Sequence, residues 1–263
     1  MARRWNTEEE KKYYDELFDL YVKKNKTLGE IALILGIAEQ TVFQRLGRLN
    51  IKTIPHLKEN YLLKPKNVKI PKSYSPNLAE FFGIMLGDGH LSHFQVQVNL
   101  GTKEMEYAEY VRGLIGKIFK TKPKIAIRAK GYCDVYLGST VVTSWLFKEG
   151  LVSNKIKAQV DIPKWIFTRK TFMNSFLRGF FDTDGSVYKL RYGIQISLTN
   201  HSRPILLSLH KMLSALRYSS SVVNKHNIYI TRKSDLARFF KEVKPRNPKH
   251  VRRFKSFVSM MNA

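Results

Sequence analysis

The chain has 263 residues, 43% of them apolar, so it can bury one large core or two modest ones and is too hydrophobic for a disordered protein. Cys133 is the only cysteine, which excludes an internal disulfide and a cysteine-rich zinc site. No apolar run approaches the ~18 residues of a membrane span, and the first residues do not resemble a signal peptide. We therefore expect an intracellular protein, located in the cytoplasm, the nucleoid or an organellar matrix.

The charge of the chain favours a polyanionic partner. Lysine and arginine number 46 against 21 aspartate and glutamate residues, a formal net charge of +25, and each phosphate neutralised releases condensed counterions. The alternatives are a ribosomal-type protein and a membrane-surface protein, but no basic amphipathic stretch or lipidation signal supports the latter. Residues 1–50 hold nine basic and eight acidic residues, whereas residues 51–263 hold 37 and 13. This contrast predicts a domain boundary near residue 52.

The first module, residues 1–50, shows two helix starts. Thr7 with Glu10 has the spacing of a capping box and predicts a long helix to about Lys24. Thr27 with Glu30 repeats that spacing and predicts a short second helix.

The rest of this module resembles a helix-turn-helix, with Gly36 in the turn and a third helix over about 38–49. Ala32 is expected where the helices cross, and Ile31, Leu35, Ile37 and Val42 are expected to form the small core. The resemblance implies that the third helix presents polar side chains to the major groove, namely Glu39, Gln40, Gln44 and Arg45. The alternative is a small helical packing domain with an ordinary polar face. Residues 51–74, rich in lysine and proline, are predicted to form an extended basic linker.

The second module contains an internal repeat. EFFGIMLGDGHL at 80–91 and FLRGFFDTDGSVY at 176–188 are both apolar helical segments with a central glycine, each ending in Asp-Gly. Alternating strands, a helix and further alternating stretches follow each segment. The pattern predicts two α/β half-domains, residues 75–165 and 166–263, related by pseudo-two-fold symmetry.

These two motifs resemble those of the LAGLIDADG homing endonucleases, specifically the single-chain type with two motifs. The resemblance covers roughly residues 76–260 and includes the Asn-Lys segment at 151–165. It implies an α+β fold of two αββαββα units whose saddle-shaped antiparallel sheets straddle DNA.

The motif helices can be interpreted physically. Pro76 suits the first turn of a helix, and the absence of a polar face requires burial. Gly83 and Gly179 allow two such helices to approach backbone to backbone, which delivers Asp88 and Asp184 to one point at their C-terminal ends. Two carboxylates repel each other there, and the helix dipoles add to the repulsion. The alternative is a pair of ordinary helix-terminal turn residues.

Divalent cations remove this repulsion, since hard cations prefer carboxylate and carbonyl oxygens. We therefore expect Asp88 and Asp184 to hold Mg²⁺ or another divalent cation such as Mn²⁺, with Ca²⁺ supporting binding without cleavage. The resemblance adds the carbonyl groups of Gly87 and Thr183 as metal ligands. Such cations can activate water and stabilise the leaving 3′ oxygen of a phosphodiester.

Other positions of the motif, and two lysines, have separate expected roles. The earlier acidic position is Leu86 in the first copy and Asp182 in the second, and the resemblance assigns no metal to it. We interpret Asp182 as structural. The resemblance makes Lys155 and Lys249 the central lysines, which can stabilise charge near the scissile phosphate. Lys157 is an alternative to Lys155, and a phosphate contact is an alternative role for both lysines.

The strands are expected to read DNA, because alternation leaves one side-chain set on an open face. In the first half the candidates are Ser92, Gln95, Gln97, Arg128, Lys130, Asp134 and Tyr136. In the second half they are Lys189, Arg191, Gln195, Lys225, Asn227, Tyr229 and Arg232. The halves differ in sequence, so a long asymmetric target is expected.

The sequence thus predicts a site-specific, metal-dependent endonuclease that acts as a monomer on double-stranded DNA. The resemblance implies cleavage of both strands with 3′ overhangs, and a role in intron or intein mobility. The alternative is a non-cleaving binder on the same fold, either a transcription regulator or an RNA maturase with intron RNA as partner. A structural RNA-binding protein is a third option, but it needs no paired aspartates.

Overall fold

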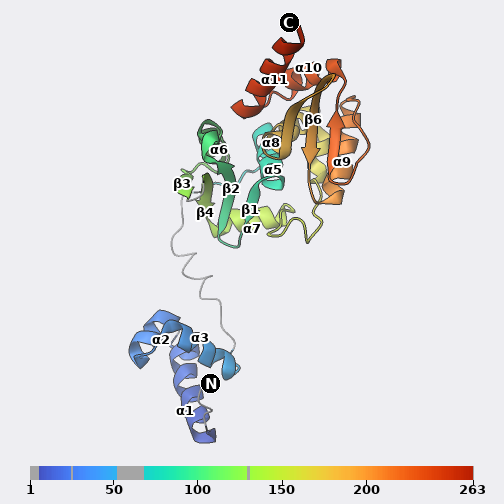
Figure 1. Ribbon diagram of the computed structural model, residues 1–263. Coiled ribbons are helices and arrows are strands. Elements are labelled where there is room, and N and C mark those ends of the chain that lie inside the picture. The colour runs from blue at the N-terminus through green and yellow to red at the C-terminus, as the bar shows by residue number, and fades with distance from the viewer. Residues whose placement is uncertain (1–5, 25, 52–67, 129–130, 263) are drawn as a thin grey trace. The chain divides into compact units, whose positions relative to one another are not determined.

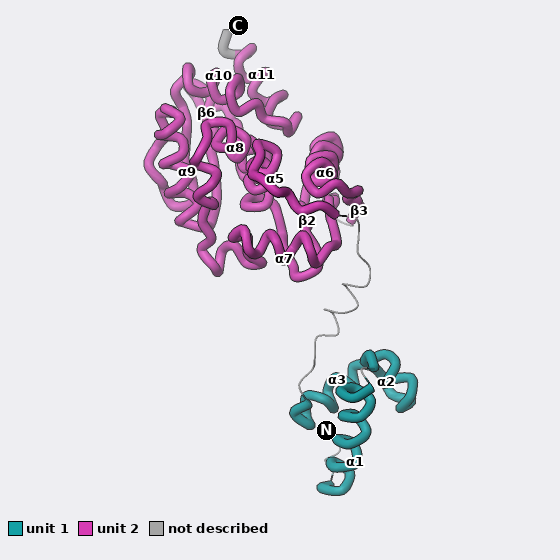
Figure 2. Tube along the Cα trace, turned by 180° about the vertical axis from the view of Figure 1, so that it is seen from behind, with its two compact units in different colours: residues 1–64 teal, residues 65–263 magenta. Residues whose placement is uncertain are grey.

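The computed structural model describes residues 6–24, 26–51, 68–128 and 131–262 (Figure 1). The chain divides into two compact units, residues 1–64 and residues 65–263 (Figure 2), each with its own hydrophobic core. No helix in the described ranges combines the length and hydrophobicity needed to cross a bilayer.

Unit 1 is built from helices. They are α1 (Thr7–Phe18), which continues into a π-helical turn η1 (Asp19–Lys23), α2 (Leu28–Leu35) and α3 (Glu39–Arg48). The first capping box lies one residue earlier than Thr7 and Glu10 would place it, because Asn6 and Glu9 cap each other's backbone amides. The second box forms between Thr27 and Glu30 as predicted.

Gly36 ends α2 in the left-handed conformation, with φ of 62°, which glycine adopts without steric cost. The chain then turns directly into α3, and Ile31 and Val42 are fully buried between the helices. The buried apolar residues of unit 1 are Leu17, Tyr21, Ile31, Val42, Leu46, Leu49 and Ile51. Leu35 and Ile37 are only partly buried against this cluster.

The expected linker, residues 51–74, is shorter at both ends. Ile51 belongs to the core of unit 1. At the other end Val68 and Ile70 pack on the core of unit 2, and the Lys69 amide donates to the Phe119 carbonyl over 2.9 Å. The intervening residues 52–67 lie outside the described part of the chain.

The elements of unit 2 fall into two sets, each with one motif helix and one sheet. The first is α5 (Pro76–Leu86), β1 (Gly89–Leu91), β2 (Gln95–Gly101), the 3₁₀ turn η2 (Thr102–Glu104), α6 (Met105–Phe119), β3 (Lys124–Arg128), β4 (Tyr132–Gly138) and α7 (Thr140–Lys148). The second is η3 (Lys164–Thr168), α8 (Lys170–Asp184), β5 (Gly185–Leu190), β6 (Gly193–Thr199), α9 (Arg203–Ala215), β7 (Asn227–Ile230), α10 (Lys233–Glu242) and α11 (Pro248–Asn262).

Each half forms one antiparallel sheet, in the order β1-β2-β4-β3 and β5-β6-β7. Helices α6 and α7 pack on the first sheet, and α9 and α10 pack on the second. Alternate residues such as Val96 and Val98 are buried against these helices, while the residues between them lie on the opposite, open face. The predicted α+β fold with two pseudo-symmetric antiparallel sheets is confirmed.

The second half has one strand fewer than the expected αββαββα unit in the described residues. The Ser221 amide donates to the Tyr229 carbonyl over 2.8 Å, as a fourth strand would. The Tyr229 amide, however, donates to the Ser221 hydroxyl rather than to a backbone carbonyl. Because the serine side chain replaces the return bond, residues 219–224 run beside β7 without continuing the ladder.

Helices α5 and α8 lie side by side between the two sheets (Figure 1). Ser75 caps α5 and Pro76 occupies its first turn, as predicted. Gly83 lies against the backbone of α8 at Phe176 and Phe180, and Gly179 lies against that of α5. The two helices therefore approach backbone to backbone, which brings their C-terminal ends together.

Candidate active site

Asp88 and Asp184 leave the C-terminal ends of these two helices. Asp184 is the last residue of α8, and Asp88 follows α5 by two residues. A methyl group on Gly87 would lie 3.4 Å from the Asp184 carboxyl carbon and 2.9 Å from Cβ of Thr183. The ends of α5 and α8 therefore touch at this point, and the two acids share one site.

The environment disfavours the charged form of both acids. Displacement of water by the surrounding protein raises the pKa of Asp88, although part of its side chain reaches solvent. Burial, with the negative charge of Asp88 as a second cause, raises the pKa of Asp184 to about 7. This mutual repulsion is what two acids at helix C-termini were expected to show.

Lys155 supplies a positive charge to this pair. Its ammonium group donates to the Met85 carbonyl over 3.1 Å and to the Gly87 carbonyl at the end of α5. Burial lowers the pKa of Lys155, and the charges of Asp184 and Asp88 oppose that effect. Lys157 is exposed, so the structure distinguishes Lys155 from its alternative.

Asn200 is a site residue that sequence reasoning missed. Its amide donates to Oδ2 of Asp184 over 2.9 Å and to the Leu86 carbonyl over 3.4 Å. This bond favours the ionised carboxylate and lowers the pKa of Asp184 against the larger effect of burial. An asparagine directly after β6 was the available signal, because this strand returns to the end of α8.

Lys249 lies in an ion pair with Glu104 of the first half. Nζ of Lys249 is 3.0 Å from Oε1 of Glu104, and the side-chain amide of Asn247 donates to the same oxygen over 2.8 Å. Burial opposes ionisation of Glu104, but the bonds from Asn247 and Lys249 outweigh it and lower its pKa. Lys249 still acts on Asp88, whose pKa its charge lowers.

Asp182 serves as an anchor between segments. Its carboxylate accepts hydrogen bonds from the backbone amides of Arg246, over 2.8 Å, and Asn247, over 3.1 Å. Burial nevertheless raises its pKa to about 7. The structural interpretation of Asp182 agrees with these contacts, which hold the segment that leads to Lys249.

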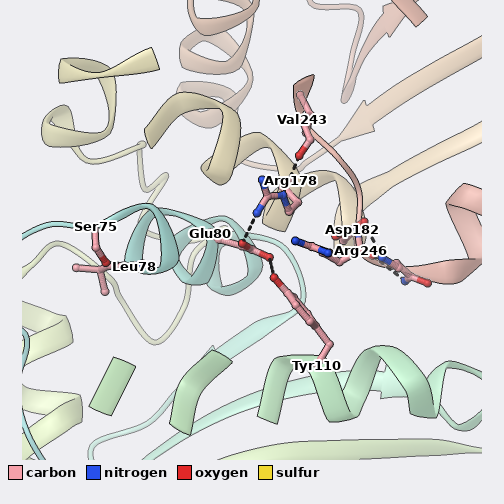
Figure 3. A network of polar contacts seen from close by, with 9 residues as sticks. Ser75, Leu78, Glu80, Tyr110, Arg178, Asp182, Val243 and Arg246 are labelled. Carbon is pink, nitrogen blue, oxygen red and sulfur yellow. Dashed lines mark hydrogen bonds and ion pairs between the residues drawn. The ribbon is translucent and has the colours of Figure 1, made fainter. Parts of the chain in front are cut away.

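A second buried network joins α5 to α8 (Figure 3). Arg178 reaches from α8 to Glu80 on α5 over 2.9 Å and also donates to the Val243 carbonyl. Tyr110 donates to the other oxygen of Glu80 over 2.5 Å. Burial raises the pKa of Glu80, and the Arg178 charge lowers it. This network ties the two motif helices together.

The open face of the first sheet carries most of its predicted DNA-reading residues. Gln97 lies between His90 and Tyr136, and Lys124 follows across the sheet, so one polar row crosses four strands. Gln95 shares this face, and Asp134 accepts a hydrogen bond from Arg128 over 2.6 Å. Ser92 lies in the turn between β1 and β2, where its hydroxyl accepts from the Gln95 amide. Lys130 lies outside the described residues.

Three predicted residues of the second sheet also lie on its open face, namely Gln195, Asn227 and Tyr229. Lys189 does not, because it pairs with Ile194 and shares the helix-covered side with Val187. Tyr188, which pairs with Gln195, occupies the open face instead.

The remaining second-half candidates lie outside the strands. Arg191 is in the β5–β6 turn with its guanidinium over the Tyr192 ring, and Lys225 is in the turn before β7. Arg232 precedes α10 and donates to the Ser219 hydroxyl. These three side chains are exposed, but because they lie outside the strands, strand alternation does not determine on which face of the sheet they lie.

The candidates of unit 1 lie on α3. Gln40 and Gln44 are exposed, as is Glu39. Arg45 is half-buried, with its guanidinium 4.7 Å from the centre of the Tyr13 ring. Packing inside unit 1 therefore occupies Arg45, whereas the two glutamines face solvent.

Asp88 and Asp184 provide two carboxylates for a metal ion, and the Gly87 carbonyl, which Lys155 also contacts, lies beside them. No cluster of three or more histidine, cysteine or acidic side chains suited to a metal occurs among the described residues. The oxygen donors and the repulsion between the two acids fit a hard divalent cation. Further ligands would have to come from carbonyl groups, water or substrate phosphate.

Curated relatives match this chain over only a small part of their own length. A replication factor C small subunit of Methanocaldococcus jannaschii is 27% identical over 192 residues, 69% of this chain and 10% of the relative. A DNA polymerase of the same organism is 24% identical over 238 residues, 84% of this chain and 13% of the relative. A glutamine–fructose-6-phosphate aminotransferase of this organism is 26% identical over 136 residues, which are 51% of this chain and 12% of the relative. The chain thus spans about a tenth of the length of these relatives.

Solved structures with a similar chain path include the LAGLIDADG meganuclease I-AabMI bound to uncleaved DNA, at 15% identity and a TM-score of 0.48, covering 72% of this chain and 91% of that one. The N-terminal LAGLIDADG domain of DUF199/WhiA matches at 15% identity and a TM-score of 0.47, and the match covers 65% of this chain and 82% of that domain's chain. A family model described as a LAGLIDADG-like domain matches residues 171–244, which span the second motif helix and its sheet. Residues 171–244 therefore match a LAGLIDADG-like domain, which contains the second of the two predicted motifs.

Proposed function

We propose that the chain is a site-specific, metal-dependent DNA endonuclease of the homing type. The observation that carries this proposal is the meeting of Asp88 and Asp184 at the touching ends of α5 and α8. A pair of acids that repel each other costs stability, so a protein without use for them would gain by losing one. A strongly basic chain that keeps such a pair fits phosphodiester hydrolysis.

Asp88 and Asp184 would hold the metal, with the carbonyl groups of Gly87 and Thr183 as further oxygen donors. Mg²⁺ or Mn²⁺ bound there would supply an activated water and charge stabilisation at the leaving 3′ oxygen. Ca²⁺ is expected to support DNA binding without cleavage. Asn200 orients the Asp184 carboxylate. Lys155 offers its ammonium charge next to the acids, where negative charge would develop on the phosphate.

The two open sheet faces are the proposed DNA-binding surface. Polar side chains such as Gln97 and Gln195 alternate there with the buried apolar set. The halves present different side chains, which matches a long asymmetric target read by a single chain. Unit 1 would add contacts through the exposed face of α3, with Gln40 and Gln44 toward the groove.

The curated relatives support a role in mobility. A replication factor C small subunit, a DNA polymerase and an aminotransferase have different names and functions, yet this chain matches each of them over about a tenth of the relative's length. Such a match is expected for an element inserted into unrelated host proteins, as a mobile intein or intron product would be. Double-strand cleavage with 3′ overhangs at an unoccupied site would serve that mobility.

Cleavage by Asp88→Asn and Asp184→Asn variants tests the proposal, with Asp15→Asn on the exposed side of α1 as the control. Randomised duplex DNA is incubated with Mg²⁺, Ca²⁺ or EDTA, and the cut ends are sequenced. Both site variants should bind DNA and lose cleavage, whereas the control should cut like the wild type. Wild-type binding without any cleavage would instead favour a regulator, and selective binding of RNA would favour a maturase.

A further inference from the structure

We propose that Arg128 and Asp134 together read a guanine in the half-site bound by the first sheet. This inference rests on the DNA-binding function proposed above and assigns a base to one pair of residues. Nε of Arg128 donates to Oδ2 of Asp134 over 2.6 Å. The pair joins β3 to β4 on the open face of the sheet.

The strand register builds this pair. Asp134 lies directly opposite Ala126 on β3 and Asn99 on β2, while Arg128 lies opposite Tyr132. Arg128 therefore meets Asp134 along the diagonal, which a long side chain can span. The methyl group of Ala126 cannot donate a hydrogen bond, so this neighbour leaves the carboxylate to the arginine.

Asp134 and Arg128 differ in how much of each side chain is exposed to solvent, and Arg128 is the exposed partner. The Asp134 side chain is only 3% exposed, whereas that of Arg128 is 47% exposed. The carboxylate is thus a fixed support beneath a guanidinium group that reaches solvent. Because the bond uses Nε, the terminal Nη groups keep their donors for a ligand.

Those donors match guanine better than any other base. Guanine presents two acceptors, O6 and N7, to the major groove, and arginine can bind both at once. Adenine presents a donor beside its N7 acceptor, and this donor would oppose a guanidinium group. An arginine whose orientation is already fixed loses less side-chain entropy when it binds.

A phosphate contact is the competing role, and the carboxylate argues against it. The negative charge of Asp134 opposes the attraction of Arg128 for a phosphate, while the bond restricts the direction of the guanidinium group. Lys124, on the same strand and the same face, has no ion pair among the described residues and better fits a backbone contact. The two cations on β3 therefore have different expected effects on binding.

Selection from randomised duplex DNA tests the inference, using the full chain with Ca²⁺ so that binding is read without cleavage. The selected wild-type sites should contain one invariant guanine. Arg128→Ala should reduce discrimination at that position alone by roughly tenfold to hundredfold. Arg128→Gln should shift the preference there to adenine, and Asp134→Asn should weaken the guanine preference at the same position.

Lys124→Ala is the matched control. It should weaken binding to all sequences alike and lower the salt slope by about one, with the base preferences unchanged. Thermal melting establishes that each variant folds, and Arg128→Gln suffices if Asp134→Asn unfolds. An equal loss of affinity for all sequences in Arg128→Ala would overturn the guanine assignment. A wild-type chain that selects no DNA sequence would instead refute the proposed function itself.

Discussion

Gly83 and Gly179 lie opposite each other where α5 and α8 cross, each against the backbone of the other helix. A methyl group on Gly83 would overlap the Phe176 carbonyl and lie 3.2 Å from the Gly179 carbonyl carbon. Since backbone atoms cannot rotate away, Gly83→Ala has to separate the helices. The same separation would move Asp88 away from Asp184.

We expect Gly83→Ala to lower the free energy of unfolding by about 2 kcal/mol or more, the cost of overpacking a core. Gly113→Ala is the matched control, because Gly113 lies within α6 with nothing near its missing methyl group. The control should raise the free energy by about 0.5–1 kcal/mol through helix propensity. Urea denaturation of both variants measures this, and similar stabilities would argue against the close helix contact.

The raised pKa of Asp184 predicts a pH dependence of stability in the metal-free protein. Burial and the charge of Asp88 raise this pKa to about 7, above the value near 4 of an exposed aspartate. The folded state therefore binds this proton more tightly than the unfolded state. The resulting stabilisation is complete below about pH 4 and is lost as the pH rises through about 7.

Asp184→Asn removes this dependence, while Asp182, whose pKa is also raised to about 7, remains in both proteins. In EDTA, the free energy of unfolding should fall less between about pH 5 and pH 8 in the variant than in the wild type. Denaturant titrations at the two pH values give the comparison. The same fall in both proteins would mean that Asp184 ionises normally.

Asn200 acts through Asp184 and is therefore a positioning residue. Asn200→Ala removes a hydrogen bond that lowers the pKa of Asp184, so this pKa should rise further. Cleavage should drop by about tenfold or more at neutral pH and recover partly at higher pH. The pH profile of kcat/KM separates this effect from misfolding, which would lower the rate equally at every pH.

Local sequence signals sufficed for the elements that form the site. Ser75 with Pro76 marks the start of α5, and the central glycines of both motifs indicate a close helix pair. Alternation located the buried and open sides of β2 and β6. These features depend on neighbours a few residues away, so one sequence is enough to find them.

The contacts that complete the site join residues far apart in the chain. Arg178 and Glu80 are 98 positions apart, and Lys249 and Glu104 are 145 apart. No local pattern marks such partners, because helix packing decides which charged side chains meet. The same reason explains Asn200, whose role depends on where β6 ends relative to α8.

The alternation was predicted wrongly for β5 alone, because Gln195 on β6 and Tyr229 on β7 lie on the open face as predicted. Lys189 and Arg191 were predicted as the open-face residues of β5, but Lys189 pairs with the buried Ile194 and Arg191 lies in the turn after β5. The register instead pairs Gln97 with a residue two positions after Asp88, but pairs Gln195 with Tyr188, four positions after Asp184. Both offsets are even, so the open side starts in the same way after each aspartate, and Lys189, at an odd offset, lies on the helix-covered side.

The two central lysines should differ in their effect on cleavage. Lys155 contacts the end of α5 and is influenced by both acids, whereas Lys249 is held by Glu104. We expect Lys155→Met to lower kcat by roughly a hundredfold to a thousandfold. Lys249→Met should lower it by less than about tenfold, since the ammonium group of Lys249 is paired with Glu104 and contacts neither acid nor the end of α5 in the described contacts. Single-turnover cleavage measures both, and equal losses would contradict this asymmetry.

Deletion of residues 1–50 separates the contributions of the two units. Unit 2 has its own core, so the truncated chain should fold and still cleave DNA. The deleted segment carries a net charge of only +1, so the slope of log affinity against log salt should change little. The loss should instead appear as weaker discrimination at one end of the target, where α3 would read bases.

The double variant Gln40→Ala, Gln44→Ala in the full chain should reproduce this loss, because both side chains are exposed and their removal leaves the core of unit 1 intact. Arg45 stays in place in that variant, packed over Tyr13. Selection from randomised DNA compares the three proteins. If the truncated chain and the double variant keep every base preference of the wild type, α3 does not read DNA, and unit 1 serves another purpose.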